Sequence, residues 1–413
     1  MHSHWNDIAV FADWAIQLRY APPWEFHGLS GYPPGYLLIL LGIGRLYGLI
    51  APHFADPGGL LLVALLKFPS ILMDIVDAWI VWGIARCVAP RAALAAGIVW
   101  LFNPVAWIGS TLWGQIDSIC WGFALAAVLL MLLAGRDPRK TTARFAWAWL
   151  ALTISFLIKP VAAPLLLVLV VYVAVGRAGT LRRRLGGTAA GIAASGVLVW
   201  AVVALFSGVA DPIRVAQLLL EQLTVHSVVG TAVSYTSVNA YNAWSVLLPF
   251  YVPDSLKVGG VSLAAIGAVV TSVTVLALLA RLVQLRSERA FVECAMLTIF
   301  AVFLLSTRMH ERYVDGAVML SVALIGLGPE FVAFAAVFTL TTSLDTLYGL
   351  RFVMFFDRYA PHAPLPLPGV NLGDFWPAVS HPASLVNVML FAAMFWTYVR
   401  PRFPQPRPAL EPG

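Results

Sequence analysis

The chain has 413 residues, of which 60% are hydrophobic and only 11% are charged, and its formal net charge is +6. Its mean hydropathy of +0.85 excludes an ordinary soluble domain. Apolar runs of about 17–25 residues, each long enough to cross a ~30 Å hydrocarbon core, recur along the sequence. The sequence therefore predicts an all-α polytopic membrane protein, and the positive charge does not require a nucleic-acid partner.

The first 59 residues are predicted to form an outer, non-cytoplasmic segment of a single domain, 1–413. "MHSHWNDIAVFADWAIQLRY" lacks the features of a signal peptide. Either this short tail crosses the membrane by itself, or a further span lies upstream, and we expect the second. The apolar run Gly35–Ala51 contains Arg45 and follows two prolines. We interpret residues 35–51 as a helix lying in the outer interface, with a short true span as the alternative.

About eleven spans are expected within a transmembrane bundle over residues 60–399, followed by a cytoplasmic tail at 400–413. The expected spans are 60–86, 92–110, 117–134, 145–158, 160–176, 187–206, 257–281, 290–306, 316–328, 331–344 and 383–399. Sixteen of the 26 Lys and Arg residues fall in alternate connections: Arg86, Arg91, Arg136, Arg139, Lys140, Arg144, Arg177, Arg182, Arg183, Arg184, Arg281, Arg286, Arg289, Arg400, Arg402 and Arg407. The positive-inside rule places these connections in the cytoplasm, so the remaining polar segments share the outer face.

Asp7 is the first carboxylate of the outer segment. It could accept a proton from a hydroxyl group held at the membrane surface, or it could cap a helix. The sequence alone leaves both interpretations open.

"FNPVAWIGSTLWGQIDS", residues 102–118, places tryptophans beside hydrogen-bonding side chains at the outer end of a span. Trp113, Gln115 and Asp117 are suited to binding a sugar ring. The alternatives are that the tryptophans anchor the chain in the lipid interface and that Asp117 caps the following helix.

Three ionisable residues, Lys67, Asp74 and Asp77, occur at membrane depth on one helix face. Such groups normally face a bundle interior or a wet cavity because a bilayer disfavours charge. They are expected either to form a structural Lys–Asp pair or to contact a substrate.

The remaining outer motifs carry cations and amides. Lys159 lies at the tip of a tight hairpin, and Asn239 and Asn242 lie in the long loop at about 207–256. "RMHERY" brings Arg308, His310, Glu311 and Arg312 to the outer end of a span. Because arginine matches phosphate oxygens bidentately, we expect Arg308, His310 and Arg312 to bind a phosphate, with Lys159 reaching the same cavity.

Taken in order, "DIAVFADWA…YPPGYLLIL", "KFPSILMDIVDAW", "NPVAWIGSTLWGQIDS", "IKP", "SVNAYNAW" and "TRMHERY" resemble the motifs of bacterial membrane mannosyltransferase-like proteins. These are relatives of the second mannosyltransferase of GPI-anchor assembly, in the GT-C superfamily, and the resemblance runs from about residue 6 to 315. It implies a polyprenyl-phosphate sugar donor, inversion at the anomeric carbon and Asp7 as general base. The substrate contacts then expected are Tyr32, Trp113, Gln115, Asp117, Asn239, Asn242 and Glu311.

The predicted protein is thus a membrane glycosyltransferase, with a lipid, glycan or protein acceptor and membrane lipids as further partners. It is expected in the bacterial inner membrane, with its active site on the periplasmic face. No Asp-X-Asp metal motif occurs in the chain, and neither a metal nor a cofactor is predicted. Two alternatives are a transporter or flippase that uses Asp74 and Asp77 as a proton relay, and an inactive scaffold subunit of a glycosylation complex.

Overall fold

The computed structural model of the protein describes residues 6–26, 32–53, 59–221, 234–355 and 372–400. These residues are predominantly helical, and the strands among them are two residues long each. The all-α fold class predicted from the sequence is therefore confirmed.

The α-helices are α1 (Asn6–Tyr20), α2 (Pro34–Ile50), α3 (Leu60–Val88), α4 (Ala93–Leu101), α5 (Pro104–Trp107), α6 (Asp117–Ala134), α7 (Thr141–Ile158), α8 (Pro164–Val175), α9 (Leu181–Ser207), α10 (Pro212–Glu221), α11 (Ala243–Leu247), α12 (Leu263–Leu285), α13 (Glu288–Leu305), α14 (Asp315–Ala323), α15 (Pro329–Phe355) and α16 (Leu372–Val399). The 3-10 turns are η1 (Pro23–Glu25), η2 (Pro90–Ala92), η4 (Pro138–Lys140), η5 (Pro160–Ala162) and η8 (Ile325–Leu327), and η3 (Ile108–Trp113) is a π-helix. The strands are β1 (Ser237–Val238), β2 (Lys257–Val258), β3 (Val261–Ser262) and β4 (Met309–His310).

Seven helical segments of the described chain are long and apolar enough to cross a membrane: Pro90–Trp113, Asp117–Ala134, Pro138–Ile158, Leu181–Ser207, Leu263–Leu285, Pro329–Arg351 and Ala378–Val399. The four other expected spans fall on α3, α8, α13 and α14. Of these, α8 has 12 residues and α14 has nine, whereas α13 carries three charged side chains within its first six residues. The hydropathy of the sequence therefore located the helices, and seven of the eleven expected spans coincide with these long apolar segments.

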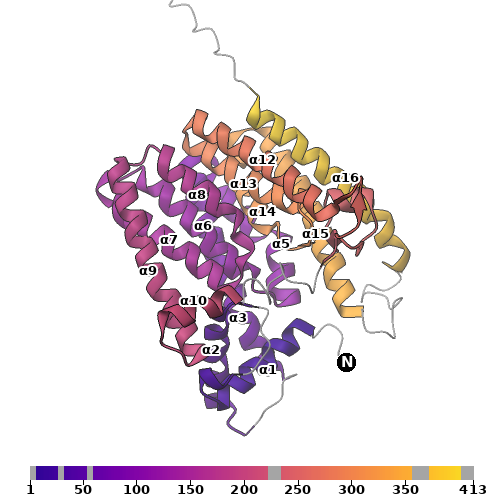
Figure 1. The fold of residues 1–413 in the computed structure, drawn as a ribbon. Helices are drawn as coiled ribbons and strands as arrows, with labels where there is room; N and C mark the ends of the chain where they lie inside the picture. Colours follow the sequence, from indigo (N-terminus) through magenta and orange to yellow (C-terminus); the bar gives the residue numbers. More distant parts are fainter. Residues whose placement is uncertain (1–5, 27–31, 54–58, 222–233, 356–371, 401–413) are drawn as a thin grey trace, which may run out of the picture.

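The helices pack as a bundle around α6 and α13. Helix α6 contacts α3 and α7, and α7 contacts α9. Helix α13 is largely enclosed, and every residue from Ala290 to Ala301 is buried. Figure 1 shows α1 and α2 together at one end of the ribbon and α12 and α13 at the other.

Helix α2 packs against α1 through small residues. A Cβ atom at Gly44 would collide with the backbone of Ala15, and one at Gly35 would collide with Leu157 of α7. The opposite side of α2 leaves Leu46 and Leu49 exposed. This apolar outer side suits a helix in contact with lipid, and its placement in the interface remains a prediction.

The basic connections contact one another away from α1 and α2. Arg136, after α6, donates to Cys87 O at 2.7 Å and pairs with Glu288 at 3.1 Å. Arg183 donates to Pro138 O, and Arg281 donates to Arg400 O. The sequence predicted that these connections share one face of the membrane from their charge alone, and in the structure they contact one another.

A short parallel pairing joins two loops that are far apart in the sequence. Ser237 of β1 pairs with Met309 of β4, and Val238 pairs with His310. Asn239 and Arg308, which flank these strands, have positive φ angles of 61° and 66°. The pairing fixes "RMHERY" against the long loop before α12.

Candidate functional site

The Asp7 carboxylate is turned toward the segment between α5 and α6. Its Oδ2 accepts a hydrogen bond from Trp113 Nε1 at 3.1 Å and another from Gln115 Nε2. Asp7 lies in the first turn of α1. Its side chain therefore joins two of the motifs singled out in the sequence, 106 and 108 residues apart.

The turn that presents Trp113 and Gln115 depends on Gly114. This residue follows the π-helix η3 with φ of +85°, a conformation that favours glycine. A Cβ atom at Gly114 would lie 3.1 Å from Lys67 Cε and would collide with Ile8 Cδ1. Gly109 O accepts hydrogen bonds from the backbone N–H groups of both Gly114 and Gln115, at 3.0 and 2.9 Å.

Beside this group lies a cluster of four buried charges, which we call the paired-charge cluster: Asp117, Lys159, Glu311 and Arg312. Lys159 Nζ donates to Asp117 Oδ1 at 2.7 Å, and Arg312 Nε lies 3.4 Å from Asp117 Oδ2. Arg312 Nη1 lies 3.1 Å from Glu311 Oε1. Two cations and two carboxylates thus balance each other, as buried charges require.

Arg312 connects the paired-charge cluster to Asp7. Its guanidinium carbon lies 4.0 Å from the centroid of the Trp113 ring, in cation–π contact. The same indole donates to Asp7. A carboxylate, an indole and a guanidinium therefore follow one another in direct contact.

Lys159 and Arg312 share Asp117 as counter-ion, whereas Arg308 pairs with another carboxylate. Arg308 Nε lies 2.7 Å from Asp254 Oδ2. Asp254 also accepts from Thr307 Oγ1 at 3.1 Å. The structure therefore gives Arg308 a role in holding the long loop, alongside whatever role it has toward a ligand.

His310 is an uncharged member of the site. Burial, together with the cations Arg312 and Lys159, lowers the pKa of His310 to about 3. Its Nδ1 lies 3.9 Å from Glu311 Oε2. At neutral pH it can offer a ligand one N–H hydrogen bond but no positive charge.

The two asparagines of the long loop build the loop itself. Asn242 is fully buried, and its Oδ1 accepts from the backbone N–H groups of Trp244 and Ser245 at the start of α11. Asn239 Oδ1 accepts from the Tyr251 hydroxyl at 2.7 Å. Both side-chain oxygens are therefore engaged within the protein.

Tyr32 belongs to an aromatic group on the α1–α2 side of the site. Its ring centroid lies 5.7 Å from that of Phe11 and 5.8 Å from that of Tyr36. Burial and the nearby Asp7 carboxylate raise the pKa of the Tyr32 hydroxyl. Tyr32 is thus near Asp7, where a substrate contact was expected.

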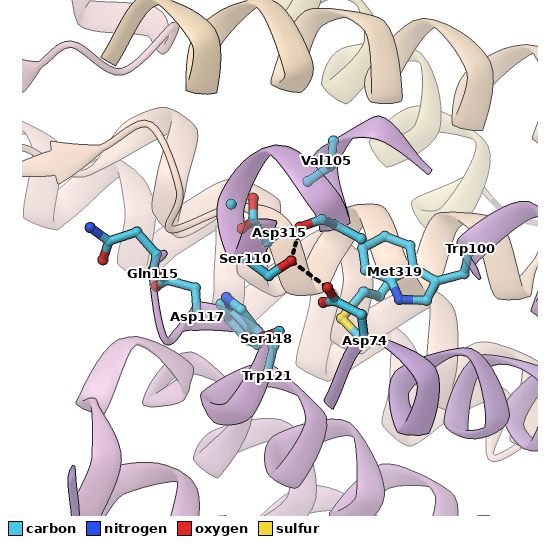
Figure 2. Close-up of a pocket in the computed structure, with 12 residues that line it drawn as sticks. Asp74, Trp100, Val105, Ser110, Gln115, Asp117, Ser118, Trp121, Asp315 and Met319 are labelled. Carbon is cyan, nitrogen blue, oxygen red and sulfur yellow. Dashed lines mark hydrogen bonds between the residues drawn. The ribbon is translucent and has the colours of Figure 1, made fainter. Parts of the chain in front are cut away.

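The ionisable residues of α3 do not form the expected pair. Lys67 Nζ donates to the carbonyl oxygens of Thr111 and Leu112, at 2.8 and 3.1 Å, and Asp74 accepts from the Ser110 hydroxyl (Figure 2). Of the two alternatives that the sequence left open for these residues, the structural Lys67–Asp74 pair is therefore wrong. The π-helix η3 leaves backbone acceptors facing α3, and helical spacing alone could not reveal them.

A small cavity of about 20 Å³ lies behind Gln115 and Asp117. Asp74, Asp315 and Trp121 also line it (Figure 2), and it has room for one water molecule. Ser110, Trp121 and Asp315 were not among the site residues predicted from the sequence. The sequence did signal Asp315, because this acidic residue follows directly after "RMHERYV".

Across the described ranges, no group of three or more His, Cys, Asp or Glu side chains is placed to hold a metal ion.

A family model described as dolichyl-phosphate-mannose-protein mannosyltransferase matches residues 66–200, about a third of the chain. This stretch includes Asp117 and Lys159, whereas Asp7 and Arg312 lie outside it. The match confirms, for that part of the chain, the resemblance drawn from the motifs.

A crystal structure of ArnT from Cupriavidus metallidurans bound to undecaprenyl phosphate is similar to this chain, with a TM-score of 0.49 and 16% identity. The similarity covers 95% of this chain and 73% of that one. No curated protein matched the chain.

Proposed function

We propose that the protein is a membrane glycosyltransferase that moves a sugar, mannose, from a polyprenyl-phosphate donor to an acceptor hydroxyl group, with inversion. The observation that carries this proposal is that a partly exposed carboxylate, Asp7, and a buried cation, Arg312, both contact the side chain of Trp113. Transfer from a sugar phosphate needs a base for the attacking hydroxyl group and positive charge for the departing phosphate. The family match over residues 66–200 supports the same class of reaction.

Asp7 is the general base in this scheme. The hydrogen bonds from Trp113 and Gln115 both go to Oδ2, which orients the carboxylate and leaves Oδ1 for the acceptor hydroxyl group. Attack by that hydroxyl oxygen on the anomeric carbon breaks the bond to phosphate, and the hydroxyl proton passes to Asp7. Phosphate needs no strong acid in order to leave.

Arg312 and Lys159 stabilise the departing phosphate. Arg312 Nε and Nη1 make no well-formed hydrogen bond within the described chain, although both lie near carboxylates, so they can turn to phosphate oxygens. The side chains of Lys159 and Arg312 are only 8% and 10% exposed. The donor phosphate therefore reaches Lys159 and Arg312 when the segment around Asp117 moves away from them. The phosphate then pairs with these cations in place of Asp117.

The site is assigned to the periplasmic side of a bacterial inner membrane, where the donor phosphate lies at the interface. A transport function for Asp74 and Asp77 fits less well. The cavity beside Asp74 has room for one water molecule, and Asp77 is fully buried.

Replacing Asp7 by Asn tests the proposal, because the amide keeps the shape of the side chain but accepts no proton. Turnover of a radiolabelled polyprenyl-phosphate mannose with a lipid-hydroxyl acceptor should fall by ~10²–10⁴-fold, while donor binding stays close to that of the wild type. The matched control is Asp13→Asn in the same helix, where the carboxylate is exposed and accepts from Gln17 at 2.7 Å. Wild-type turnover in Asp7→Asn would reject this mechanism.

A further inference from the structure

Two apolar grooves run along the outer surface of α3 at the end remote from Asp7. One, of about 510 Å³, lies against α4 and is lined by Trp79, Trp82, Leu94 and Ile98 among others. The second, of about 630 Å³, lies against α6 and is lined by the same two tryptophans together with Leu129, Leu133, Arg86 and Arg136. We call the two together the paired groove.

Trp79 and Trp82 form the ridge that separates the two halves. Their ring centroids lie 6.1 Å apart at an interplanar angle of 73°, and Trp79 is 70% exposed. Glycines allow the neighbouring helices to approach this ridge. A Cβ atom at Gly97 would lie 3.0 Å from Trp82 Cβ, and one at Gly83 would lie 2.9 Å from Leu129 Cδ2.

The paired groove is charged at one end and apolar elsewhere. Arg86 is exposed and its guanidinium carbon lies 5.3 Å from the Trp82 ring centroid. Arg136 donates to Cys87 O and pairs with Glu288. Two guanidinium groups therefore face one carboxylate, which leaves an excess positive charge at this end of the groove.

This end lies far from the proposed transfer site. Asp117 is the first residue of α6, and Arg136 follows two residues after its last residue, Ala134. An 18-residue helix is about 27 Å long. A lipid with its phosphate at Arg86 and Arg136 would therefore lie in the opposite leaflet from a donor phosphate at Lys159 and Arg312.

We propose that the paired groove binds one anionic phospholipid with two acyl chains. The phosphate contacts Arg86 and Arg136, and one chain lies on each side of the Trp79–Trp82 ridge. Basic residues at the ends of membrane helices attract anionic head groups. The two grooves share the Trp79–Trp82 ridge, and the groove against α6 carries Arg86 and Arg136, so together they match a lipid with one anionic head group and two chains. A single-chain polyprenyl phosphate would fill only half of the site.

The test measures lipid retention by the full-length protein in detergent, using native mass spectrometry during titration with phosphatidylglycerol or phosphatidylcholine. We expect one tightly retained phosphatidylglycerol. Arg86→Gln should weaken its binding about fivefold, since each basic residue near an anionic surface contributes ~1 kcal/mol, and should leave phosphatidylcholine unaffected. Trp79→Ala should weaken both lipids, and Arg86→Lys should keep the preference for the anionic lipid.

Arg182→Gln and Trp147→Ala, which change an exposed arginine and an exposed tryptophan elsewhere, are the matched controls and should bind as the wild type does. The proposal is wrong if phosphatidylglycerol and phosphatidylcholine bind equally, or if Arg86→Gln behaves like Arg182→Gln. Displacement of phosphatidylglycerol by an equimolar polyprenyl phosphate would instead assign the groove to a single-chain lipid. None of these results depends on whether the protein transfers a sugar.

Discussion

Asp117 is the residue on which the charge balance of the site depends, because it contacts both Lys159 and Arg312. Asp117→Asn removes the carboxylate that pairs with both of these cations. Removing one partner of a buried pair typically costs roughly 3–5 kcal/mol. The variant should therefore unfold at a markedly lower temperature in detergent, measured by a thermal-shift assay.

Two further variants check that this loss comes from the unpaired charge. Adding Lys159→Met to Asp117→Asn should recover part of the stability, since the excess positive charge is removed. Asp137→Asn breaks a more exposed contact, 3.8 Å from Lys140, and should cost about 1 kcal/mol or less. Equal losses in Asp117→Asn and Asp137→Asn would contradict the paired-charge cluster.

His310 should make the protein less stable in acid. Its pKa is about 3 in the folded protein and ~6.5 in an unfolded chain, so the unfolded state binds the proton more readily. The stabilisation is complete above pH 6.5 and is lost progressively as the pH falls toward 3. At pH 5 the loss relative to pH 7 is about 2 kcal/mol.

His310→Asn removes this titration, so its unfolding temperature should fall less between pH 7 and pH 5 than that of the wild type. His381→Asn, which changes a histidine on α16, is the control and should retain the wild-type pH dependence. Parallel pH profiles for His310→Asn and the wild type would show that His310 is protonated normally.

The sequence predicted several site residues singly but not the contacts between them. Trp113 and Gln115 were expected to bind a sugar, whereas the structure also has them donating to Asp7. Asn242 was expected at a substrate, and its side-chain oxygen caps α11. Residue type and local spacing indicate which groups are polar, but a partner 106 residues away is fixed only by tertiary packing.

Among the elements, the turn after η3 matters most for the site. Gly114→Ala places a methyl group against Ile8 and Lys67 at a φ of +85°, which costs about 1–3 kcal/mol or displaces Gln115. We expect turnover to fall by about 10–100-fold with donor affinity nearly unchanged. Gly109→Ala is the matched control in the same π-helix, since no atom lies within 4 Å of its added Cβ.

Hydropathy predicted where helices occur, including α2 and the segments around α6 and α9. It could not predict the π-helix η3 or the pairing of β1 with β4. A π-helix differs from an α-helix by its hydrogen-bond register, which leaves no pattern in hydropathy. Two-residue strands are likewise too short to show alternation, and their partners lie about 70 residues apart.

At the scale of the whole molecule, the loops divide into two groups by contact as well as by charge. The basic loops meet through Arg136 and Arg281, whereas Asp7, Asp117 and Arg312 meet away from them. The first group is predicted to be cytoplasmic. Which group of loops faces the cytoplasm can be measured directly by thiol labelling.

Single cysteines at Lys257 and at Thr180, both exposed positions, would report on the two faces in a Cys87→Ser background. Cys120 and Cys294 are buried and should not react. In intact cells, an impermeant thiol reagent should label Lys257→Cys and spare Thr180→Cys. The reverse labelling would invert the topology, and disruption of the cells should make both positions reactive.

The contacts from Asp7 through Trp113 to Arg312 can form only after Arg312 has been synthesised. Asp7 and Arg312 are 305 residues apart in the sequence. At a synthesis rate of about 5–20 residues per second, Arg312 is made roughly 15–60 s after Asp7. Throughout that interval the ribosome-bound chain holds the proposed base without the proposed phosphate-binding cation. A product truncated before residue 312 would therefore carry most of the helices but lack Arg312.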